Sequence, residues 1–524
     1  MKPPADPQVW GPSQRPLQLI ARNVSTRYLA IFIDSALGLA LLPFNIGHLG
    51  AAAYGLWALT TSVTWFFGVL DLGYGGALVK FIAQYRALRD RGALNEIVST
   101  IALVFAGLGA VCFGVAAVLA WRIESLFNID PAQVRTAQSV LLIVAAYLAV
   151  RFPFAIFGAI VYGFQRYYLN NLVSITTSLI VAGVNVALLA NGYSLVTLVA
   201  ATTTVRVLSL GLFMLNAYRA FPGLRVRPSL FRRTRLQEVT AFSVYMFVLD
   251  LAAKVNYSSD SVVIGAMLNT TAVATYAIGL RLSQVAQKLT SQLNDALFPN
   301  VVDSSAMRRQ DRLQLILLQG TKLSTALAAP VCLGLVVVAD PLIHSWVGRH
   351  FDASVLPTQV LLLVVLLRVS TASANLILKG AGQHKLLTYT NVTTAIVNVL
   401  LSIVLIRPFG LVGVALGTLI PVTLATVFVI YPVACREVGL SIGRPLTRGI
   451  LPALWPALIM VALLRLTQGL GPAGLAGVLV HLAAGGLVYL GLFVGLGLGT
   501  EERRFYWMKL RSILFPRRQA AAAV

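Results

Sequence analysis

Apolar stretches of about 20 residues recur along the whole chain, separated by short polar segments. A helix of that length crosses the ~30 Å hydrocarbon core of a bilayer, where every backbone polar group must be satisfied within the protein. The composition agrees, since 58% of the residues are hydrophobic, 11% are charged and the mean hydropathy is +0.81. These features predict an all-α polytopic membrane protein and exclude a soluble globular fold.

The apolar stretches predict fourteen membrane-spanning helices, of which the seventh and eighth carry the most charge. Their expected ranges are 24–46, 54–79, 96–120, 137–161, 171–190, 194–217, 239–267, 272–299, 318–340, 357–378, 388–406, 411–433, 450–467 and 475–498.

Basic residues gather in alternate polar segments between these helices. The chain has 41 Lys and Arg against 18 Asp and Glu, a net charge of +23. Because Lys and Arg are enriched in cytoplasmic loops of membrane proteins, we interpret the excess as a topology signal and not as a nucleic-acid-binding surface. It places both termini in the cytoplasm. The densest cluster, residues 219–238, is expected to be a cytoplasmic anchor, with binding of anionic lipids as the alternative.

The chain also repeats itself with an offset of about 220 residues. Tyr54 in AYGLWAL matches Tyr276 in TYAIGLRL, and similar matches follow in order: VCFG with VCLG, VLLIV with VLLLV, ITTSLIV with VTTAIVN, and YSLV with FGLV. Each half contains six predicted helices, an even number. Both halves therefore enter the membrane in the same orientation, related by an axis along the membrane normal.

This repeat predicts two pseudo-symmetric six-helix lobes followed by two further helices. Two such lobes around a midline cavity suit alternating access in a transporter. The expected parts are an N-terminal cytoplasmic tail at 1–23, a first lobe at 24–218, a basic cytoplasmic linker at 219–238, a second lobe at 239–434, two appended helices within 435–498, and a basic cytoplasmic tail at 499–524.

Polar side chains form one-sided stripes along the seventh and eighth predicted helices. Residues three and four apart share a helix face, and a Lys, Arg or Asp at the centre of a spanning helix costs roughly 2.5–3.5 kcal/mol. The stripes are therefore expected to line a cavity between the lobes, although Asp250 and Lys254 could simply form an i,i+4 ion pair. The stripes are Asp250, Lys254, Tyr257 and Ser261, and Arg281, Gln284, Lys288, Ser291 and Asp295.

Other charged residues within predicted helices are Arg27, Asp34, Asp71, Arg151, Arg206, Asp260 and Arg368. We expect Arg151, which precedes the kink-prone FPF at 152–154, to line the cavity. Arg27 is either a cavity residue or a helix-end anchor. The acids Asp34, Asp250, Asp260 and Asp295 are candidates for coupling to an ion or for ion pairs. The excess of positive charge fits an anionic substrate such as a diphosphate headgroup.

The three cysteines are isolated from one another, so the sequence indicates no disulfide framework, no metal site and no cofactor.

Residues 48–87 resemble the polysaccharide flippases of the multidrug/oligosaccharidyl-lipid/polysaccharide (MOP) exporter superfamily. The resemblance lies in an L-G-x-x-x-Y-G motif at Leu49–Gly55 and a D-x-G-x-G motif at Asp71–Gly75, and TYAIGLRL with NDALFP in the second lobe is also similar. It implies a non-enzymatic transporter that moves an undecaprenyl-diphosphate-linked oligosaccharide across a bacterial inner membrane, for example for O-antigen, in contact with a glycan polymerase or ligase.

The resemblance also implies basic cavity residues on the first, second, seventh and eighth helices. Arg27, Lys254, Arg281 and Lys288 match this pattern, whereas the second predicted helix has no deep basic residue. Two alternatives remain open. One is a related drug or metabolite antiporter, which would centre on acidic residues. The other is a membrane glycosyltransferase or polymerase, which would need a catalytic group on a sizeable external loop.

Overall fold

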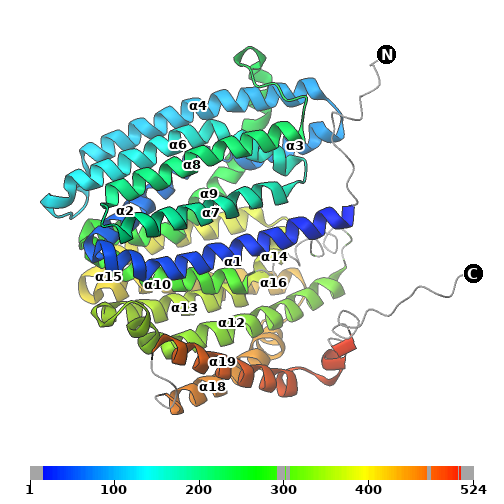
Figure 1. Cartoon of the computed structure of the whole chain (residues 1–524). Helices are drawn as coiled ribbons and strands as arrows, with labels where there is room; N and C mark the ends of the chain where they lie inside the picture. The colour runs from blue at the N-terminus through cyan, green and yellow to red at the C-terminus, as the bar shows by residue number, and fades with distance from the viewer. Residues whose placement is uncertain are drawn as a thin grey trace, which may run out of the picture. The chain divides into compact units, whose positions relative to one another are not determined.

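The computed structural model describes residues 16–291, 301, 307, 309–468, 474–504 and 507–508 (Figure 1). Within these ranges the secondary structure is helical and contains no strand, which confirms the all-α prediction. The chain forms two compact units, Met1–Leu282 with Asn391–Thr418, and Ser283–Thr390 with Leu419–Val524. The lobe boundaries expected at 218 and 239 stay a prediction.

The first unit consists mainly of long helices joined by short turns. Its elements are α1 (Pro16–Leu49), α2 (Ala51–Phe67), η2 (Gly68–Asp71), α3 (Tyr74–Ala87), α4 (Arg91–Trp121), α5 (Ile123–Leu126), η3 (Pro131–Gln133), α6 (Val134–Gly163), α7 (Tyr167–Ala190), α8 (Leu195–Ala220), η4 (Pro228–Leu230), α9 (Arg233–Met267), most of α10 (Thr270–Thr290), and the larger part of α15 (His384–Ala425).

The second unit contains the end of α10, both ends of α15 and the remaining helices. These are α12 (Gln310–Trp346), η5 (Arg349–Ser354), α13 (Val355–Ser370), α14 (Ala372–Gly380), the π-helical turn η6 (Thr426–Ile430), α16 (Tyr431–Glu437), α17 (Gly443–Pro445), the π-helical turn η7 (Leu446–Ile450), α18 (Leu451–Leu466), α19 (Leu475–Leu492) and the π-helical turn η8 (Phe493–Gly497).

Ten helical stretches in the described part of the chain are long and apolar enough to cross a membrane. One of them, His384–Glu437, covers two predicted spans and is interrupted at Gly410, where φ is 56° and ψ is −134°. The other nine correspond to the first, third to sixth, ninth, tenth, thirteenth and fourteenth predicted spans. The charged seventh and eighth spans are helical in α9 and α10 but are not among the ten, so the count of fourteen stays a prediction.

The prediction of one continuous helix over 54–79 is wrong, because the chain breaks between α2 and α3. Leu72 and Gly73 both adopt left-handed backbone conformations, with φ of 51° and 75°. The Asp71 carboxylate accepts a hydrogen bond from the backbone N–H of Gly75 at 3.0 Å and so caps the first turn of α3. The D-x-G-x-G motif therefore builds a break and a new helix start, which hydropathy alone does not reveal.

The two glycines of the L-G-x-x-x-Y-G motif have different structural roles. Gly50 joins α1 to α2 with φ of 79°, a conformation that favours glycine. Gly55 is buried, and a Cβ atom there would overlap the backbone carbonyl of Thr270 at the start of α10. The motif thus combines a tight turn with a close approach of two helices.

The basic segment 219–238 is held against the start of α4 by three polar side chains. The Asn95 amide donates to the Gly223 carbonyl at 3.0 Å and accepts from the Arg225 N–H at 2.9 Å. Ser99 accepts from the Arg227 N–H at 3.2 Å, and Thr100 accepts from the Arg232 N–H at 3.0 Å. These hydrogen bonds hold the segment in an ordered conformation against α4.

The helices α18 and α19 pack against α12 and against each other. The Tyr489 hydroxyl donates to the Ala453 carbonyl at 3.1 Å, and Gly485 leaves room for the side chain of Leu464. Close approach at small residues and interhelical hydrogen bonds are the usual basis of helix association in membranes. The two appended helices therefore pack beside α12, a helix of the second half of the chain.

Candidate functional site

A cavity of about 590 Å³ lies among the helices of the first unit. Its wall comes mainly from α2, α6, α7 and α8, with contributions from the turn between α2 and α3 and from α4. The volume falls within the ~300–1,000 Å³ typical of small-molecule sites. The lining residues that matter for its chemistry are Trp57, Asp71, Tyr147, Arg151, Asn185 and Arg206.

Two arginines on neighbouring helices line this cavity. Arg151 lies on α6 and Arg206 on α8, and the two helices pack together along much of their length. Both side chains are accessible, and neither guanidinium has a hydrogen bond or an ion pair to any residue that the structure describes. Unpaired charge inside a membrane protein is costly, and such residues usually mark a substrate path.

Neutral polar groups accompany the two arginines. Asn185 on α7 is only 3% exposed, and its Oδ1 atom has no hydrogen-bond partner among the described residues. A buried amide oxygen without a partner costs about 1–3 kcal/mol, so a ligand or water in the cavity would be expected to satisfy it. Tyr147 on α6 and Trp57 on α2 add a hydroxyl and an aromatic ring. The cavity can therefore hold a molecule with both charge and hydroxyl groups.

Asp71 lines the cavity on the side of the break between α2 and α3. Two arginines and one aspartate give the charged lining a net charge of +1 when all three are ionised.

Arg281, the first of the predicted cavity residues on α10, lies against α1. Its Nη2 atom donates to the carbonyl of Asp34 at 3.0 Å, and its guanidinium occupies the space beside Gly38 where a Cβ atom would otherwise be. Its Nε atom is buried and has no hydrogen-bond partner among the described residues. The guanidinium is therefore only partly satisfied by the protein.

The other predicted site residues are distributed over several helices. Gln284 and Lys288 are half-buried on α10, and Arg27 and Asp34 are exposed on α1. The backbone of Asp250, Lys254 and Tyr257 lies in α9, but their side chains are outside the described part of the structure, as is the whole of Asp295. The site assignment of these residues stays a prediction.

Asp260, a predicted coupling acid, belongs to a buried polar network. It is 6% exposed and accepts hydrogen bonds from the Tyr276 hydroxyl at 2.5 Å and from the Thr418 hydroxyl at 3.2 Å. Thr418 in turn accepts from the Asn398 amide at 2.7 Å, and Asn398 accepts from Ser259 at 3.1 Å. These residues come from α9, α10 and α15, so a sequence stripe on one helix does not reveal the network.

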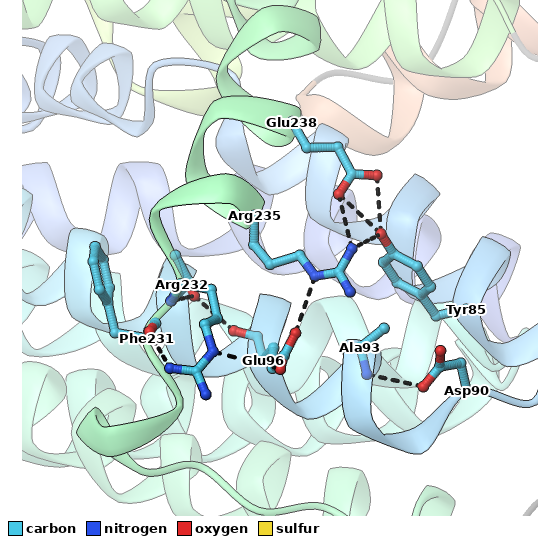
Figure 2. A network of polar contacts seen from close by, with 9 residues as sticks. Tyr85, Asp90, Ala93, Glu96, Phe231, Arg232, Arg235 and Glu238 are labelled. Carbon is cyan, nitrogen blue, oxygen red and sulfur yellow. Dashed lines mark hydrogen bonds and ion pairs between the residues drawn. The ribbon is translucent and has the colours of Figure 1, made fainter.

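A second polar network joins the ends of α3, α4 and α9 (Figure 2). Arg235 lies at its centre, with its Nε 3.2 Å from Glu96, and its Nη1 2.8 Å from the Tyr85 hydroxyl and 3.3 Å from Glu238. Burial opposes ionisation of Arg235, but its carboxylate neighbours outweigh this and raise its pKa. Burial and the hydrogen bond to Glu238 raise the pKa of Tyr85 to about 12.

These features define a class of protein. The chain has many apolar helices long enough to span a membrane, with a polar cavity and charged side chains among them. This arrangement is typical of membrane transporters. Residues 49–356 match the family model described as "Polysaccharide biosynthesis protein", so the chain belongs to this family.

Curated relatives agree with the family. The chain is 20% identical over 420 residues to "Probable flippase AglR" of Haloferax volcanii, covering 78% of this chain and 83% of the relative. It is 22% identical over 223 residues to "Probable low-salt glycan biosynthesis flippase Agl15" of the same organism, covering 43% of this chain and 45% of the relative.

Solved structures share the fold. "Lipid II flippase MurJ, inward closed conformation" superposes with a TM-score of 0.70 at 15% identity, over 94% of this chain and 100% of that chain. An inward-facing multidrug resistance MATE family transporter of the MOP superfamily gives a TM-score of 0.61 at 13% identity, over 78% of this chain and 94% of that chain.

The family match confirms the expected polysaccharide family, and the superpositions confirm the expected fold. The protein is a multi-pass membrane transporter of polysaccharide biosynthesis and not an enzyme, so the glycosyltransferase alternative is wrong.

Asn185 and Arg206 line the cavity but were not among the site residues predicted from the sequence. Asn185 is a single amide in the apolar run VAGVNVALL, and Arg206 a single charge in the apolar helix α8. An isolated polar residue in such a run was the available signal.

Proposed function

We propose that this protein flips a polyprenyl-diphosphate-linked oligosaccharide from the inner to the outer leaflet of a bacterial cytoplasmic membrane, with both chain termini in the cytoplasm. The glycan would serve a surface polysaccharide such as the O-antigen of lipopolysaccharide. The observation that carries the proposal is the presence of Arg151 and Arg206 in one cavity among membrane helices, where neither guanidinium has a hydrogen bond or ion pair to a described residue. The family match and the names of the curated relatives support it.

The positively charged side chains on the membrane helices fit this substrate. A diphosphate carries at least two negative charges in a polar headgroup that lipid cannot solvate, and guanidinium groups bind phosphate oxygens through paired hydrogen bonds. Arg281, with its incompletely bonded guanidinium, is the residue of α10 best suited to this contact. Lys254, Lys288 and Arg27 would extend the positive field.

Transport would proceed by alternating access, in which the two lobes rock about the bound headgroup. An acid that gains or loses a proton or cation could couple this motion to an ion gradient. Asp260 is the candidate best supported by the structure, because its carboxylate is buried and hydrogen-bonded by groups from two other helices. A glycan polymerase or ligase is the expected neighbour on the outer side.

Gene deletion tests the proposal directly. Loss of the protein should remove one surface glycan and cause its lipid-linked precursor to accumulate on the inner side. Normal surface glycan without precursor accumulation would contradict the flippase function.

Substitution of Arg281 and Lys288 tests the headgroup site. The double variant Arg281→Ala, Lys288→Ala should lose export while the protein is inserted at its normal level. If the two residues only form structural ion pairs, their loss would leave buried carboxylates unpaired, costing about 3–5 kcal/mol, and lower the protein level. Arg281→Lys distinguishes two kinds of contact. It should impair export if the guanidinium makes paired hydrogen bonds to phosphate, and it should preserve export if only a positive charge is needed. Full export by the double variant would exclude this headgroup site.

A cation-coupled drug or metabolite antiporter is the second candidate. The observation in its favour is the buried carboxylate of Asp260, together with the fold shared with a multidrug transporter. If the protein is an antiporter, its expression should cause efflux of cationic drugs from cells, and Asp260→Asn should abolish that efflux. If it is the proposed flippase, its expression should cause no such efflux.

A further inference from the structure

We infer that Arg86 and Arg166 together bind the phosphate group of an anionic phospholipid at the turn between α6 and α7. Arg86 lies near the end of α3, and Arg166 directly precedes α7. Neither residue lines the cavity of the first unit, so this binding site is separate from that cavity and does not depend on the proposed function.

The end of α3 lies directly against this turn. A Cβ atom at Gly163, the last residue of α6, would overlap a side chain of α3. The Arg86 Nη1 atom donates to the Gly163 carbonyl at 3.1 Å, and the guanidinium lies 5.6 Å from the centre of the Phe164 ring. The chain then reverses at Gln165, where φ is 60°, and Arg166 follows. Arg86 and Arg166 therefore lie at one turn although they come from different parts of the chain.

Most of the hydrogen-bonding capacity of the two guanidinium groups is unused within the described part of the chain. Arg86 donates to Gly163, and the Arg166 side chain has no hydrogen bond or ion pair to a described residue. Both side chains are half-buried. Burial and the positive charge of Arg166 lower the pKa of Arg86, which shows that the two like charges repel each other. An anion between them would offset this repulsion and accept hydrogen bonds from several N–H groups.

The surrounding sequence supplies no carboxylate for this pair. The chain contains no Asp or Glu between Asp130 and Glu238, a range that includes α6, α7 and α8. Beyond the end of α3, Asp90 caps α4 by accepting a hydrogen bond from a backbone N–H of that helix at 3.0 Å. Glu96 and Glu238 are bound by Arg235. We therefore expect the neutralising anion to come from outside the protein.

The position of the turn in the membrane favours a lipid phosphate over other anions. Pro131–Gly163 and Tyr167–Ala190 are both long and apolar enough to span a membrane, so the turn between them lies at the membrane surface. The rings of Tyr162 and Tyr167 pair here with their centres 5.0 Å apart, and Tyr167 is 40% exposed. Tyrosines concentrate at the level of the lipid headgroups. Guanidinium groups at this level meet lipid phosphates and bind their oxygens through paired, charge-assisted hydrogen bonds.

A third arginine, on α1, adds positive charge at the same turn. The guanidinium of Arg22 lies 3.8 Å from the centre of the Tyr168 ring, which closely follows Arg166. The start of α1 is fixed here by Asn23, whose amide donates to the Gln165 carbonyl at 2.8 Å and accepts from the Tyr168 N–H at 2.9 Å. Each additional arginine near the surface strengthens the attraction of anionic lipids.

Lipid binding to the purified full-length protein in detergent tests the inference. The probes are phosphatidylglycerol, the zwitterionic phosphatidylcholine and inorganic phosphate, and native mass spectrometry gives the dissociation constant of the first bound lipid. The wild type should bind phosphatidylglycerol more tightly than phosphatidylcholine. Arg86→Gln and Arg166→Gln should each weaken phosphatidylglycerol binding by about tenfold, as expected for a charged hydrogen bond. Inorganic phosphate at millimolar concentration should not displace the lipid, because it has no acyl chains to hold it at the membrane surface.

Matched controls are available in the basic segment 219–238. Arg227 and Arg233 are exposed, and neither lies at the turn between α6 and α7. Arg227→Gln and Arg233→Gln each remove one positive charge and should bind phosphatidylglycerol like the wild type. Arg166→Gln keeps the test informative if Arg86→Gln fails to fold, because the Arg166 side chain makes no hydrogen bond or ion pair with a described residue. Thermal unfolding checks that each variant is folded.

Equal binding of the two lipids by the wild type would overturn the inference, as would unchanged phosphatidylglycerol binding in a folded Arg86→Gln or Arg166→Gln variant. An equal loss in Arg227→Gln and Arg233→Gln would also overturn it, because it would indicate a diffuse positive surface and not a site. Displacement of the lipid by inorganic phosphate would indicate a site for free phosphate and would refute the assignment to a lipid. None of these results affects the proposed flippase function, which depends on loss of export and accumulation of precursor.

Discussion

The guanidinium of Arg281 on α10 occupies the space beside Gly38 on α1, where any side chain larger than hydrogen would collide with it. From this position Arg281 donates a hydrogen bond to the backbone carbonyl of Asp34, which lies one turn before Gly38 on α1. A glycine on α1 is thus what allows a charged group of α10 to lie against the backbone of α1.

The first prediction concerns this contact. Gly38→Ala should displace the Arg281 guanidinium and reduce export toward the level of Arg281→Ala. Because the displaced group is the end of a flexible side chain, and alanine favours helix, the free energy of unfolding should change by less than about 1 kcal/mol. Export assays and thermal unfolding measure the two effects. Gly47→Ala on the same helix is the control, since a Cβ atom there meets nothing within 4 Å. Full export by Gly38→Ala, with loss in Arg281→Ala, would show that this position of the guanidinium is dispensable.

The second prediction concerns the packing of α2 against α10. A Cβ atom at Gly55 would overlap the backbone of Thr270, which cannot move without shifting a helix. Gly55→Ala should therefore lower the free energy of unfolding by about 1–3 kcal/mol, as overpacking usually does. Thermal unfolding of the purified protein in detergent measures this, with Gly47→Ala again as the control. Unchanged unfolding would mean that the two helices are not held this closely.

The third prediction concerns acid stability and Glu502, which follows α19. Its carboxylate accepts hydrogen bonds from the Lys322 ammonium at 2.6 Å, from Gln319 at 2.7 Å and from the Gly499 N–H at 2.8 Å. Burial opposes ionisation, but these donors outweigh it and hold the pKa of Glu502 below its ordinary 4.5. The contribution to stability is thus present above pH 4.5 and is lost as the pH falls through the lower folded-state pKa.

Glu502→Gln should remove this acid-dependent part of the stability. At neutral pH it should also lower the free energy of unfolding by about 1.5–3 kcal/mol, because Lys322 is buried and loses its charged partner. Thermal unfolding at neutral pH and in acid measures both effects. Glu501→Gln, at an exposed position, should behave like the wild type. The same acid dependence in wild type and Glu502→Gln would contradict the prediction.

The fourth prediction concerns alkaline stability and Tyr85. Its pKa is raised from 10 to about 12, chiefly by burial and then by the hydrogen bond to Glu238. Above pH 10 the unfolded chain loses this proton and the folded protein keeps it, so the free energy of unfolding should fall between pH 10 and about 12.

Tyr85→Phe should reduce this fall and cost about 1 kcal/mol at neutral pH through lost hydrogen bonds to Arg235 and Glu238. Unfolding followed against pH provides the measurement. Tyr193→Phe, at a tyrosine that is 53% exposed, is the control. Should Tyr85→Phe show the wild-type alkaline profile, the network in Figure 2 would contribute little to stability.

Much of the fold could be predicted from the sequence, because length and hydropathy act locally. A run of apolar residues long enough to cross a bilayer must be helical there, so α4, α6, α7, α8 and α12 follow from composition. The family motifs were also readable, and the family match confirms the polysaccharide family that they indicated. The break at Leu72 and Gly73 was missed because hydropathy does not report backbone conformation.

The sites depended on tertiary structure. Arg151 and Arg206 lie 55 positions apart and line one cavity only because α6 and α8 pack together. Asp260 is satisfied by Tyr276 and Thr418, which its own helix does not contain. Helical periodicity fixes which residues share a face but not which neighbour that face meets. In a membrane, lipid is as apolar as the helices themselves, so small residues, shape and hydrogen bonds decide that choice, as Gly38 and Gly55 do here.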